Sequence, residues 1–298
     1  MLFMTPNSHS KSTKNFSIIS TNIKYNKMKI DGSKISKELL EGLQQKRQQL
    51  NFPIKLKIIS FQNDTANQSY IKIKNNFAKL LNVDCDVHYL DGNKSSKTLR
   101  KEINIICEQK NVFGAIIQLP IPSNLNQTML INAIPEKIDV DCLTYKNLGR
   151  FYQGKKTLMP PTVLALDYLI NKYNLNLKNV LLIGQGELIG KPISQYLINH
   201  KIPFISANQS TQNLDQLCKN ADTIITGTGQ ADTVKFNDVK KDAIIFDFGC
   251  TKQQTICGDC EANQNFEETC SFFTPVPNGL GPIVIAKLFE NLLINLKQ

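Results

Sequence analysis

Residues 179–192 read Asn-Val-Leu-Leu-Ile-Gly-Gln-Gly-Glu-Leu-Ile-Gly-Lys-Pro, an apolar run followed by a glycine-rich turn. The run Val180–Ile183 predicts a short buried strand, and the turn Gly184–Gly190 predicts the start of a helix. Glycine lets the backbone turn tightly and approach a ligand, and free N–H groups at a helix start attract phosphate. The spacing GxGxxxG is one residue longer than the usual dinucleotide fingerprint, so a purely structural turn is the alternative. We expect a dinucleotide to bind here.

Strands and helices alternate on both sides of this turn. After residue 150, the pattern predicts helices over 162–173 and from about 190, and strands at 179–183, 204–207, 223–226 and 243–247. Before it, the pattern predicts strands at 54–61, 83–89 and 114–119, and helices at about 67–81 and 96–109. An earlier helix is expected to be capped by Ser33, and a last helix covers about 281–296. Such alternation predicts parallel sheets flanked by helices.

The predicted fold class is therefore α/β, with two α/β units and a cleft between them. Residues 28–150 are expected to form the first unit, which residues 281–298 complete. Residues 151–280 are expected to form the second unit, a dinucleotide-binding domain of the Rossmann type. Residues 1–27 hold four lysines and no acidic residue, and we expect a flexible extension or a leader there.

The composition does not favour a nucleic-acid or membrane protein. The net charge is +10, but only 3 of the 35 basic residues are arginines. Arginine is the preferred residue for bidentate hydrogen bonds to phosphate and guanine, so we expect no nucleic-acid partner. No run approaches the 18 or more apolar residues typical of a membrane helix, so we expect no membrane span.

The cysteines predict neither a disulfide scaffold nor a metal site. There are 8 of them, and the one close pair, Cys257 and Cys260, has no second pair and no histidine nearby. A structural zinc ion needs four ligands, so we expect no metal. Scattered thiols in a chain of this size are typical of the reducing cytoplasm. Import into an organelle through residues 1–27 stays open as an alternative.

The first unit carries an unusual set of polar residues. Tyr70 and Lys74 are four residues apart on a predicted helix, so both project from one face. Gln118 ends an apolar strand, and the carboxyl ends of parallel strands are where such sheets bind ligands. Asp141, in Asp139-Val-Asp141, can place a carboxylate in the cleft. The alternative is an ordinary amphipathic helix with solvated lysines and a surface acid.

The second unit offers another glycine turn but no clear choice of cofactor. Thr226-Gly-Thr-Gly229 ends a later strand, where a dinucleotide would also cross the sheet. After the second strand of such a unit, an acid binds the ribose of NAD, whereas arginine suits the 2′-phosphate of NADP. Residues 206–211 contain neither. The sequence therefore supports a dinucleotide without selecting one.

Taken in order, these motifs resemble those of the bifunctional methylenetetrahydrofolate dehydrogenase/cyclohydrolase family. Tyr70–Lys74 is similar to the family's Y-x-x-x-K, and Gly114–Pro120 is similar to its G-x-x-x-Q-L-P. Asp139–Arg150 is similar to DVDG…NxGR, and Gly184–Pro192 is similar to the cofactor loop. Thr274–Pro282 is similar to TPVPGGVGP. The likeness covers nearly the whole chain after its first 27 residues.

The resemblance implies roles for individual residues. Lys74 is expected to be the key residue of the cyclohydrolase step, with Gln118 hydrogen-bonded to it. Tyr70 is expected beside the folate, and Asp141 is expected to hold the pterin ring. The other substrate-binding residues implied are Ile117, Leu119, Val276, Pro277, Asn278, Gly279, Leu280 and Gly281. The cofactor-binding residues implied are Gly184, Gln185, Gly186, Gln209, Thr228, Gly229 and Cys250.

The resemblance also implies the reaction and the partners. In this family, 5,10-methylene-tetrahydrofolate is oxidised by hydride transfer to NADP, and the methenyl product is hydrolysed to 10-formyl-tetrahydrofolate. NAD stays open as the cofactor. The expected partners are tetrahydrofolate derivatives, with or without polyglutamate tails, and a second copy of the chain in a homodimer. The first unit would be the folate-binding catalytic domain of an enzyme of one-carbon metabolism that serves purine biosynthesis.

The chain departs from the family pattern at several positions. Cys142 and Asn278 stand where the family has glycine. Gln185 and Gln209 stand where an arginine and a serine commonly contact the 2′-phosphate of NADP. Two alternative functions stay open from the sequence. One is a different Rossmann-type dehydrogenase with an unknown small substrate, and the other is a non-catalytic nucleic-acid-binding protein.

Overall fold

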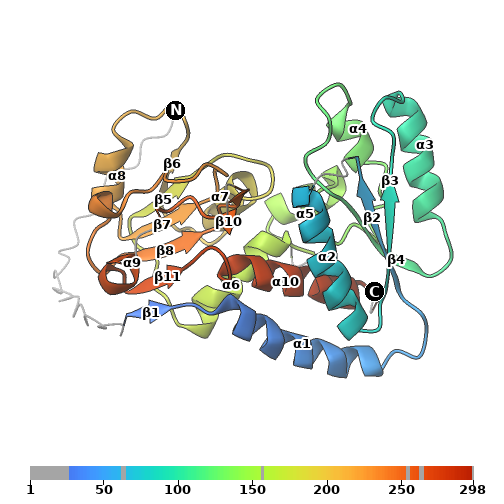
Figure 1. Ribbon diagram of the computed structural model, residues 1–298, viewed down its shortest axis with the longest axis horizontal. Helices are drawn as coiled ribbons and strands as arrows, with labels where there is room; N and C mark the ends of the chain where they lie inside the picture. The colour runs from blue at the N-terminus through green and yellow to red at the C-terminus, as the bar shows by residue number, and fades with distance from the viewer. Residues whose placement is uncertain (1–26, 62–64, 156–157, 253–255, 262–264, 297–298) are drawn as a thin grey trace, which may run out of the picture.

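The computed structural model describes residues 27–61, 65–155, 158–252, 256–261 and 265–296 (Figure 1). These residues form two α/β units that lie side by side, each built on its own parallel sheet. The α/β fold class with two units is therefore confirmed. The predicted extension 1–27 lies outside the described residues, apart from Lys27.

The sheet of the first unit has the strand order β3-β2-β4 and is parallel throughout. Its strands are β2 (Lys55–Ser60), β3 (Asp84–Tyr89) and β4 (Val112–Ile117), close to their predicted places. Two crossover helices, α2 (Thr65–Leu80) and α3 (Ser96–Cys107), connect them, as a parallel sheet requires. Two short helices that the sequence pattern did not reveal follow β4, and they are α4 (Gln127–Ile131) and α5 (Tyr145–Tyr152).

The second unit has a six-stranded sheet with the order β1-β11-β8-β7-β5-β6, and all its pairings are parallel. Its strands after the first are β5 (Val180–Ile183), β6 (Phe204–Ala207), β7 (Thr223–Thr226), β8 (Ile244–Asp247) and β11 (Phe272–Thr274). The chain runs outward from β5 to β6 and then returns past β5 to β7. Ligands of such sheets bind at the carboxyl ends of the strands where this reversal occurs.

Shorter elements connect these strands. They are α7 (Gly190–Asn199), α8 (Leu214–Asn220), η1 (Phe236–Asp238), β9 (Thr251–Lys252), β10 (Ile256–Cys257) and α9 (Asn265–Thr269). Strands β9 and β10 form a separate antiparallel pair. This pair lies directly after β8, so it brings residues 256–260 back toward the end of that strand.

The first described strand, β1 (Met28–Lys29), belongs to the second sheet. Met28 pairs with Phe272 and Lys29 pairs with Phe273 of β11. The sequence pattern placed residues from 28 onward in the first unit. A strand of two residues has no periodicity to read, and its partner lies far away in the chain, so local patterns could not reveal this pairing.

Helix α10 (Leu280–Asn295) packs against both α1 (Gly32–Gln48) and α6 (Pro161–Lys172). In Figure 1, α1 runs along the bottom of the molecule, and α10 lies above it in the middle. Ile35 of α1 and Ile283 of α10 pack in the apolar core of the second unit. Leu43 of α1 and Leu292 of α10 pack in the core of the first. The last helix therefore contributes to both cores. Within the described part of the chain, no helix is long and apolar enough to cross a membrane.

The cap of α1 differs from the expected one. Asp31 Oδ1, and not Ser33, accepts a hydrogen bond from Lys34 N, at 2.9 Å, and the helix begins at Gly32. Ser33 lies in the first turn, and its Oγ donates to Asn278 Oδ1 at 3.3 Å. A Cβ atom at Gly32 would come 1.6 Å from the Gly279 carbonyl oxygen, so only glycine allows this close backbone contact.

Candidate active site

Lys74 and Gln118 come from different elements and meet at the end of the first sheet. Lys74 lies on α2, and its Nζ donates to Gln118 Oε1 at 2.8 Å. Gln118 directly follows β4, and its backbone N–H donates to Ile59 O at 2.8 Å, which continues the pairing of β4 with β2. The glutamine is thus held at the carboxyl ends of parallel strands, where such sheets bind ligands. Lys72, two residues from Lys74, is exposed.

The two aspartates after β4 have different surroundings. Asp139 is 1% exposed, and its carboxylate accepts hydrogen bonds from Leu143 N at 3.2 Å and Thr144 N at 2.8 Å. These bonds hold the turn that leads into α5, so Asp139 has a structural role. Asp141 instead lies where its charge interacts with the Lys74 amine. Of the two aspartates, Asp141 is therefore the one whose charge influences the Lys74 amine.

Burial drives both members of this pair toward their neutral forms. It lowers the pKa of the Lys74 amine, although the charge of Asp141 opposes this shift. It raises the pKa of Asp141 to about 6, although the charge of Lys74 opposes this shift. The nearby Asp139 adds to the rise. The two shifts bring the pKa values of the amine and the carboxyl closer together, which favours proton transfer at this site.

Cys85 is a neighbour of Lys74 that the sequence analysis did not single out. It lies on β3 and packs against the core that α2 and α10 cover. Burial raises the pKa of its thiol to about 12, although Lys74 opposes this shift, so the thiol is neutral at pH 7. Strand alternation places Cys85 and Val87 on one face. It does not reveal which side chain of the covering helix lies above them.

Tyr70 connects the two units across the cleft. Its hydroxyl, on α2, donates to the Sγ of Cys250, in the loop after β8. Burial and this hydrogen bond both raise the pKa of Tyr70 above its ordinary value, so the hydroxyl keeps its proton at neutral pH. The structure thus brings together a residue expected beside the folate and a residue expected beside the cofactor.

The segment between β11 and α10 lines a cavity of about 820 Å³ at the carboxyl ends of β1, β8 and β11. Val276, Pro277 and Asn278 are among the lining residues. Asn278 has a φ of 73°, a left-handed conformation that glycine adopts freely and asparagine tolerates. Its carbonyl oxygen accepts a hydrogen bond from Gly32 N at 2.7 Å. The asparagine thus keeps the backbone shape that the family obtains with glycine.

Cys142, next to Asp141, replaces the other family glycine. It has a φ of 56° and is fully buried. The left-handed region costs a non-glycine residue on the order of 1 kcal/mol. Its Sγ donates to Leu158 O at 3.5 Å, which holds the side chain in place. The backbone beside Asp141 therefore keeps its turn in spite of the substitution.

The glycine loop after β5 has the shape that a dinucleotide requires. Gly184 has a φ of 106°, and a Cβ atom there would come 2.6 Å from Gly227 O. A Cβ atom at Gly190 would come 2.1 Å from Gly184 O. The loop opens α7, whose N-cap residue Ile189 makes no side-chain hydrogen bond to the helix start. At the helix start, Lys191 N already donates to Gly186 O at 3.0 Å and Pro192 has no N–H group. The fit to a dinucleotide therefore rests on the tight glycine turn, which lets the backbone approach a ligand closely.

Gln185 joins this loop to the end of β6. Its Nε2 donates to Ser206 Oγ at 3.0 Å, and its Oε1 accepts from Asn208 Nδ2 at 3.0 Å. All three side chains are neutral, at the place where an acid or an arginine usually selects NAD or NADP. Gln209 is exposed on the loop after β6. Gln185 is also exposed. The structure thus joins Gln185 to the end of β6, and Gln209 lies on the loop that follows this strand.

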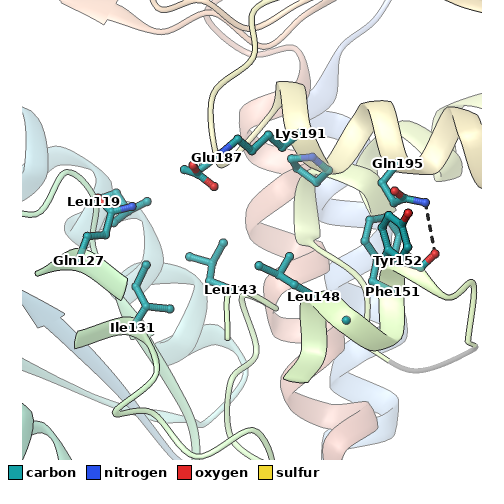
Figure 2. Close-up of a pocket in the computed structure, with 12 residues that line it drawn as sticks. Leu119, Gln127, Ile131, Leu143, Leu148, Phe151, Tyr152, Glu187, Lys191 and Gln195 are labelled. Atoms are coloured by element: carbon teal, nitrogen blue, oxygen red, sulfur yellow. Dashed lines mark hydrogen bonds and ion pairs between the residues drawn. The ribbon is translucent and has the colours of Figure 1, made fainter. Parts of the chain in front are cut away.

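Figure 2 shows a second cavity, of about 370 Å³, between the glycine loop and helices α4 and α5. Leu119 and Ile131 of the first unit line one side, and Glu187 and Lys191 line another. Leu119 follows Gln118 in the chain, so this cavity adjoins the end of the first sheet. In the described part of the chain, the residues that line the two cavities do not include Lys74, Gln118 or Asp141.

A buried amide behind the site also escaped the sequence analysis. Asn291 of α10 is 1% exposed, and its Nδ2 donates to Val140 O at 2.9 Å and Met159 O at 2.8 Å. It thereby fixes the backbone beside Asp141. The available hint was an asparagine directly before the apolar residues 292–294, because a buried amide needs hydrogen-bond partners.

Fold and site together define a class of enzyme. A Rossmann-type unit with a glycine loop lies beside a first unit in which a lysine is hydrogen-bonded to a glutamine and interacts with an aspartate. Comparison with known proteins gives the family. Residues 30–141 match the model of the tetrahydrofolate dehydrogenase/cyclohydrolase catalytic domain, and residues 160–298 match that of the NAD(P)-binding domain of the same enzymes.

Individual relatives agree with these matches. The chain is 34% identical over 275 residues to the bifunctional protein FolD of Acholeplasma laidlawii. This alignment covers 91% of this chain and 99% of that protein. The crystal structure of the bifunctional FolD methylenetetrahydrofolate dehydrogenase/cyclohydrolase from Campylobacter jejuni superposes with a TM-score of 0.84 at 27% identity. That superposition covers 91% of this chain and 98% of the other.

The chain therefore belongs to the bifunctional tetrahydrofolate dehydrogenase/cyclohydrolase family, which confirms the resemblance seen in its motifs. It is a methylenetetrahydrofolate dehydrogenase and a methenyltetrahydrofolate cyclohydrolase that uses NAD(P).

Proposed function

We propose that Lys74 is the key catalytic residue of the cyclohydrolase step and that Gln118 and Asp141 assist it. The observation that carries this proposal is the hydrogen bond of 2.8 Å between Lys74 Nζ and Gln118 Oε1, with Asp141 beside the amine. Lys74 lies on α2 one turn away from Tyr70, which meets the second unit at Cys250. A pterin ring bound there faces both the amine and the dinucleotide-binding unit.

In the oxidation, the protein mainly has to hold two rings face to face. The carbon that loses a hydride is already activated by its two neighbouring nitrogen atoms, so orientation is the main requirement. NAD(P) supplies the hydride acceptor. We propose that Tyr70 lies beside the folate and that Asp141 holds the pterin ring. The rest of the proposed folate site is Ile117, Leu119 and residues 276–281, and the rest of the proposed dinucleotide site is Gly184, Gln185, Gly186, Gln209, Thr228, Gly229 and Cys250.

The hydrolysis needs water to add to a cationic carbon and a proton to reach a ring nitrogen. With its lowered pKa, the Lys74 amine can take a proton from the attacking water and then give it to the nitrogen. Gln118 orients the amine, because its Oε1 accepts a hydrogen bond from Lys74 Nζ. An ionised Asp141 stabilises the positive charge of the bound methenyl compound.

For the cofactor we propose NADP, with NAD accepted as well. The support is the neutral set of Gln185, Ser206 and Asn208, which can donate hydrogen bonds to a phosphate or to a hydroxyl group. This set lacks the acid that would repel the 2′-phosphate. It also lacks the arginine that would bind this phosphate strongly.

We also propose a homodimer that works in the cytoplasm, binds folates with or without polyglutamate tails, and serves purine biosynthesis. In support of the dimer, β6 is an edge strand of its sheet, and Ile205 on it is 54% exposed. Ile198 on α7 is 57% exposed. Apolar side chains at a sheet edge favour association with another chain. In support of a reducing compartment, all eight cysteines are free thiols.

The assignment of Lys74 is tested with Lys74→Met. We expect methenyl-tetrahydrofolate hydrolysis, followed by the loss of the methenyl absorbance, to fall by about 100-fold or more, because the proton carrier is gone. Reduction of the dinucleotide should be retained, since hydride transfer needs no proton from the amine. Lys72→Met, on the same helix but exposed, is the matched control and should hydrolyse at the wild-type rate. Unchanged hydrolysis in Lys74→Met would remove Lys74 from the mechanism.

A further inference from the structure

Two buried aspartates lie beneath the loops that flank the proposed dinucleotide site. Asp247 ends β8 and is 2% exposed, and Asp259 follows β10 and is fully buried. The sequence analysis assigned neither of them a role. Both lie at the carboxyl ends of the second sheet, next to the turn Thr226–Gly229 after β7 and the turn Gly249–Thr251 after β8.

The carboxylate of Asp259 holds the first of these turns. Its Oδ2 accepts hydrogen bonds from Thr226 Oγ1 at 2.7 Å and from Thr228 N at 2.6 Å. Hydrogen bonds to an ionised acceptor are shorter and about twice as strong as neutral ones. The start of the turn is also held by the sheet, because Gly227 N donates to Ile183 O at 3.0 Å. The bond to Asp259 extends this support to the backbone of Thr228.

The carboxylate of Asp247 holds the second turn and also Asp259. Its Oδ1 accepts from Gly249 N at 2.7 Å and from Asp259 N at 3.1 Å, and its Oδ2 accepts from Cys260 N at 2.9 Å. Thr251 Oγ1 donates to Gly229 O at 2.7 Å. The hydrogen bonds thus form a closed ring that runs through both aspartates and both turns.

The glycines around this ring let the carboxylates come close. A Cβ atom at Gly249 would lie 2.3 Å from Asp259 Oδ1, and one at Gly258 would lie 2.2 Å from Asp247 Oδ2. Both distances are too short for any real side chain, so glycine is required at both positions. The sequence around the aspartates is therefore fitted to this ring.

We propose that Asp259 is a positioning residue for the dinucleotide and that Asp247 supports it by joining the two turns into one rigid body. The proposal rests on the proposed dinucleotide site, in which Thr228, Gly229 and Cys250 contact the cofactor. Asp259 does not touch the cofactor itself. It acts by holding the backbone of Thr228 and, through the ring, the loop that carries Cys250.

The test is Asp259→Asn, a substitution of the same shape. One oxygen of the wild-type side chain, Asp259 Oδ2, accepts both hydrogen bonds. An amide oxygen in its place can still accept from Thr226 and Thr228, but it carries no charge, so both bonds weaken. We expect the dissociation constant of NADP and of NAD, measured by calorimetry without folate, to rise by about tenfold or more. In the dehydrogenase assay, the KM for the dinucleotide should rise more than kcat falls. Hydrolysis of methenyl-tetrahydrofolate, which relies on Lys74 in the other unit, should stay within about twofold of the wild-type rate.

Two further variants keep the result interpretable. Asp242→Asn replaces an exposed aspartate of the same unit and should bind the dinucleotide as the wild type does. Thr226→Val removes one of the two donors to Asp259, so it should weaken dinucleotide binding less than Asp259→Asn does. If Asp259→Asn does not fold, the dinucleotide affinity of Thr226→Val tests the proposal instead. Wild-type dinucleotide affinity in a folded Asp259→Asn, or in Thr226→Val when only that variant folds, overturns the proposal. An equal loss of both activities in Asp259→Asn also overturns it. Lack of any dinucleotide reduction by the wild-type chain would instead refute the proposed function.

Discussion

Replacing Asp141 by asparagine should make the free enzyme more stable at neutral pH while it damages function. Burial raises the pKa of Asp141 from 3.8 to about 6 in the folded chain, although Lys74 lies beside it. The ionised carboxylate is therefore unfavourable in the fold above pH 6. Asparagine has nearly the same shape and never ionises, so it removes this cost.

The size and the pH range of the effect follow from linkage. The difference between 3.8 and about 6 corresponds to roughly 3 kcal/mol at full burial. Because Asp141 is only partly shielded from solvent, we expect about 1–2 kcal/mol. Below pH 3.8, Asp141 is protonated in both the folded and the unfolded chain, and the wild type has its full stability. That stability is lost as the pH rises through about 6. The variant should therefore gain on the wild type across this window.

Thermal unfolding of the ligand-free proteins at pH 5 and at pH 7.5 measures this. Asp141→Asn should unfold roughly 2–6 °C above the wild type at pH 7.5, and the gap should shrink at pH 5. Both catalytic activities should fall, because the pterin loses its carboxylate. Asp139→Asn is the control in the same motif, and it should lower stability, since the Asp139 carboxylate accepts two backbone hydrogen bonds. A destabilised Asp141→Asn at pH 7.5, or a gain that does not change with pH, would refute this reasoning.

Two more outcomes are expected. Gln185→Arg should raise the preference for NADP over NAD by about tenfold or more in steady-state kinetics, because a cation then faces the 2′-phosphate; an unchanged preference would mean that Gln185 does not face the ribose. Lys57→Met should lower the free energy of unfolding, measured by urea denaturation, by about 1–3 kcal/mol. Lys57 is 1% exposed, and its Nζ donates to Asp86 Oδ2 and Gln109 Oε1, both at 2.6 Å, so the substitution leaves both acceptors without this partner. Both activities should persist in that variant, because strand alternation turns Lys57 away from the face covered by α2, and a selective loss of hydrolysis would contradict this placement.

The parts of the site that local patterns define could be predicted from the sequence. The spacing of four between Tyr70 and Lys74 places both on one face of a helix. The position of Gln118 after an apolar strand places it at the end of a parallel sheet. The glycines at 184 and 190 define a strand–helix turn. Each inference uses only neighbouring residues and the geometry of a single element.

The parts that depend on distant contacts could not be predicted in this way. The pairing of β1 with β11 joins residues far apart in the chain. Cys85 lies against Lys74 only because β3 happens to pass beneath that turn of α2. Asp259 looks like any loop acid in the sequence, and its role emerges only when Thr226 and Thr228 are seen to donate to it. Buried polar contacts between separate segments have no periodicity that a pattern can reveal.

The cleft is held by two kinds of contact of very different strength. At its base, α1 and α10 bury side chains such as Ile35 and Leu292 in the cores of the two units, and each fully buried aliphatic side chain contributes about 1.5–3 kcal/mol. Away from the base, the units meet through single hydrogen bonds, each worth on the order of 1 kcal/mol. Tyr70 donates to Cys250, and Gln195 and Asn199 of α7 donate to backbone oxygens of α5. Widening the mouth for folate entry is therefore cheap, whereas moving the base is not. Because the base stays fixed, the Lys74 amine keeps its place relative to the dinucleotide-binding loops, which the proposed oxidation and hydrolysis of one bound pterin require.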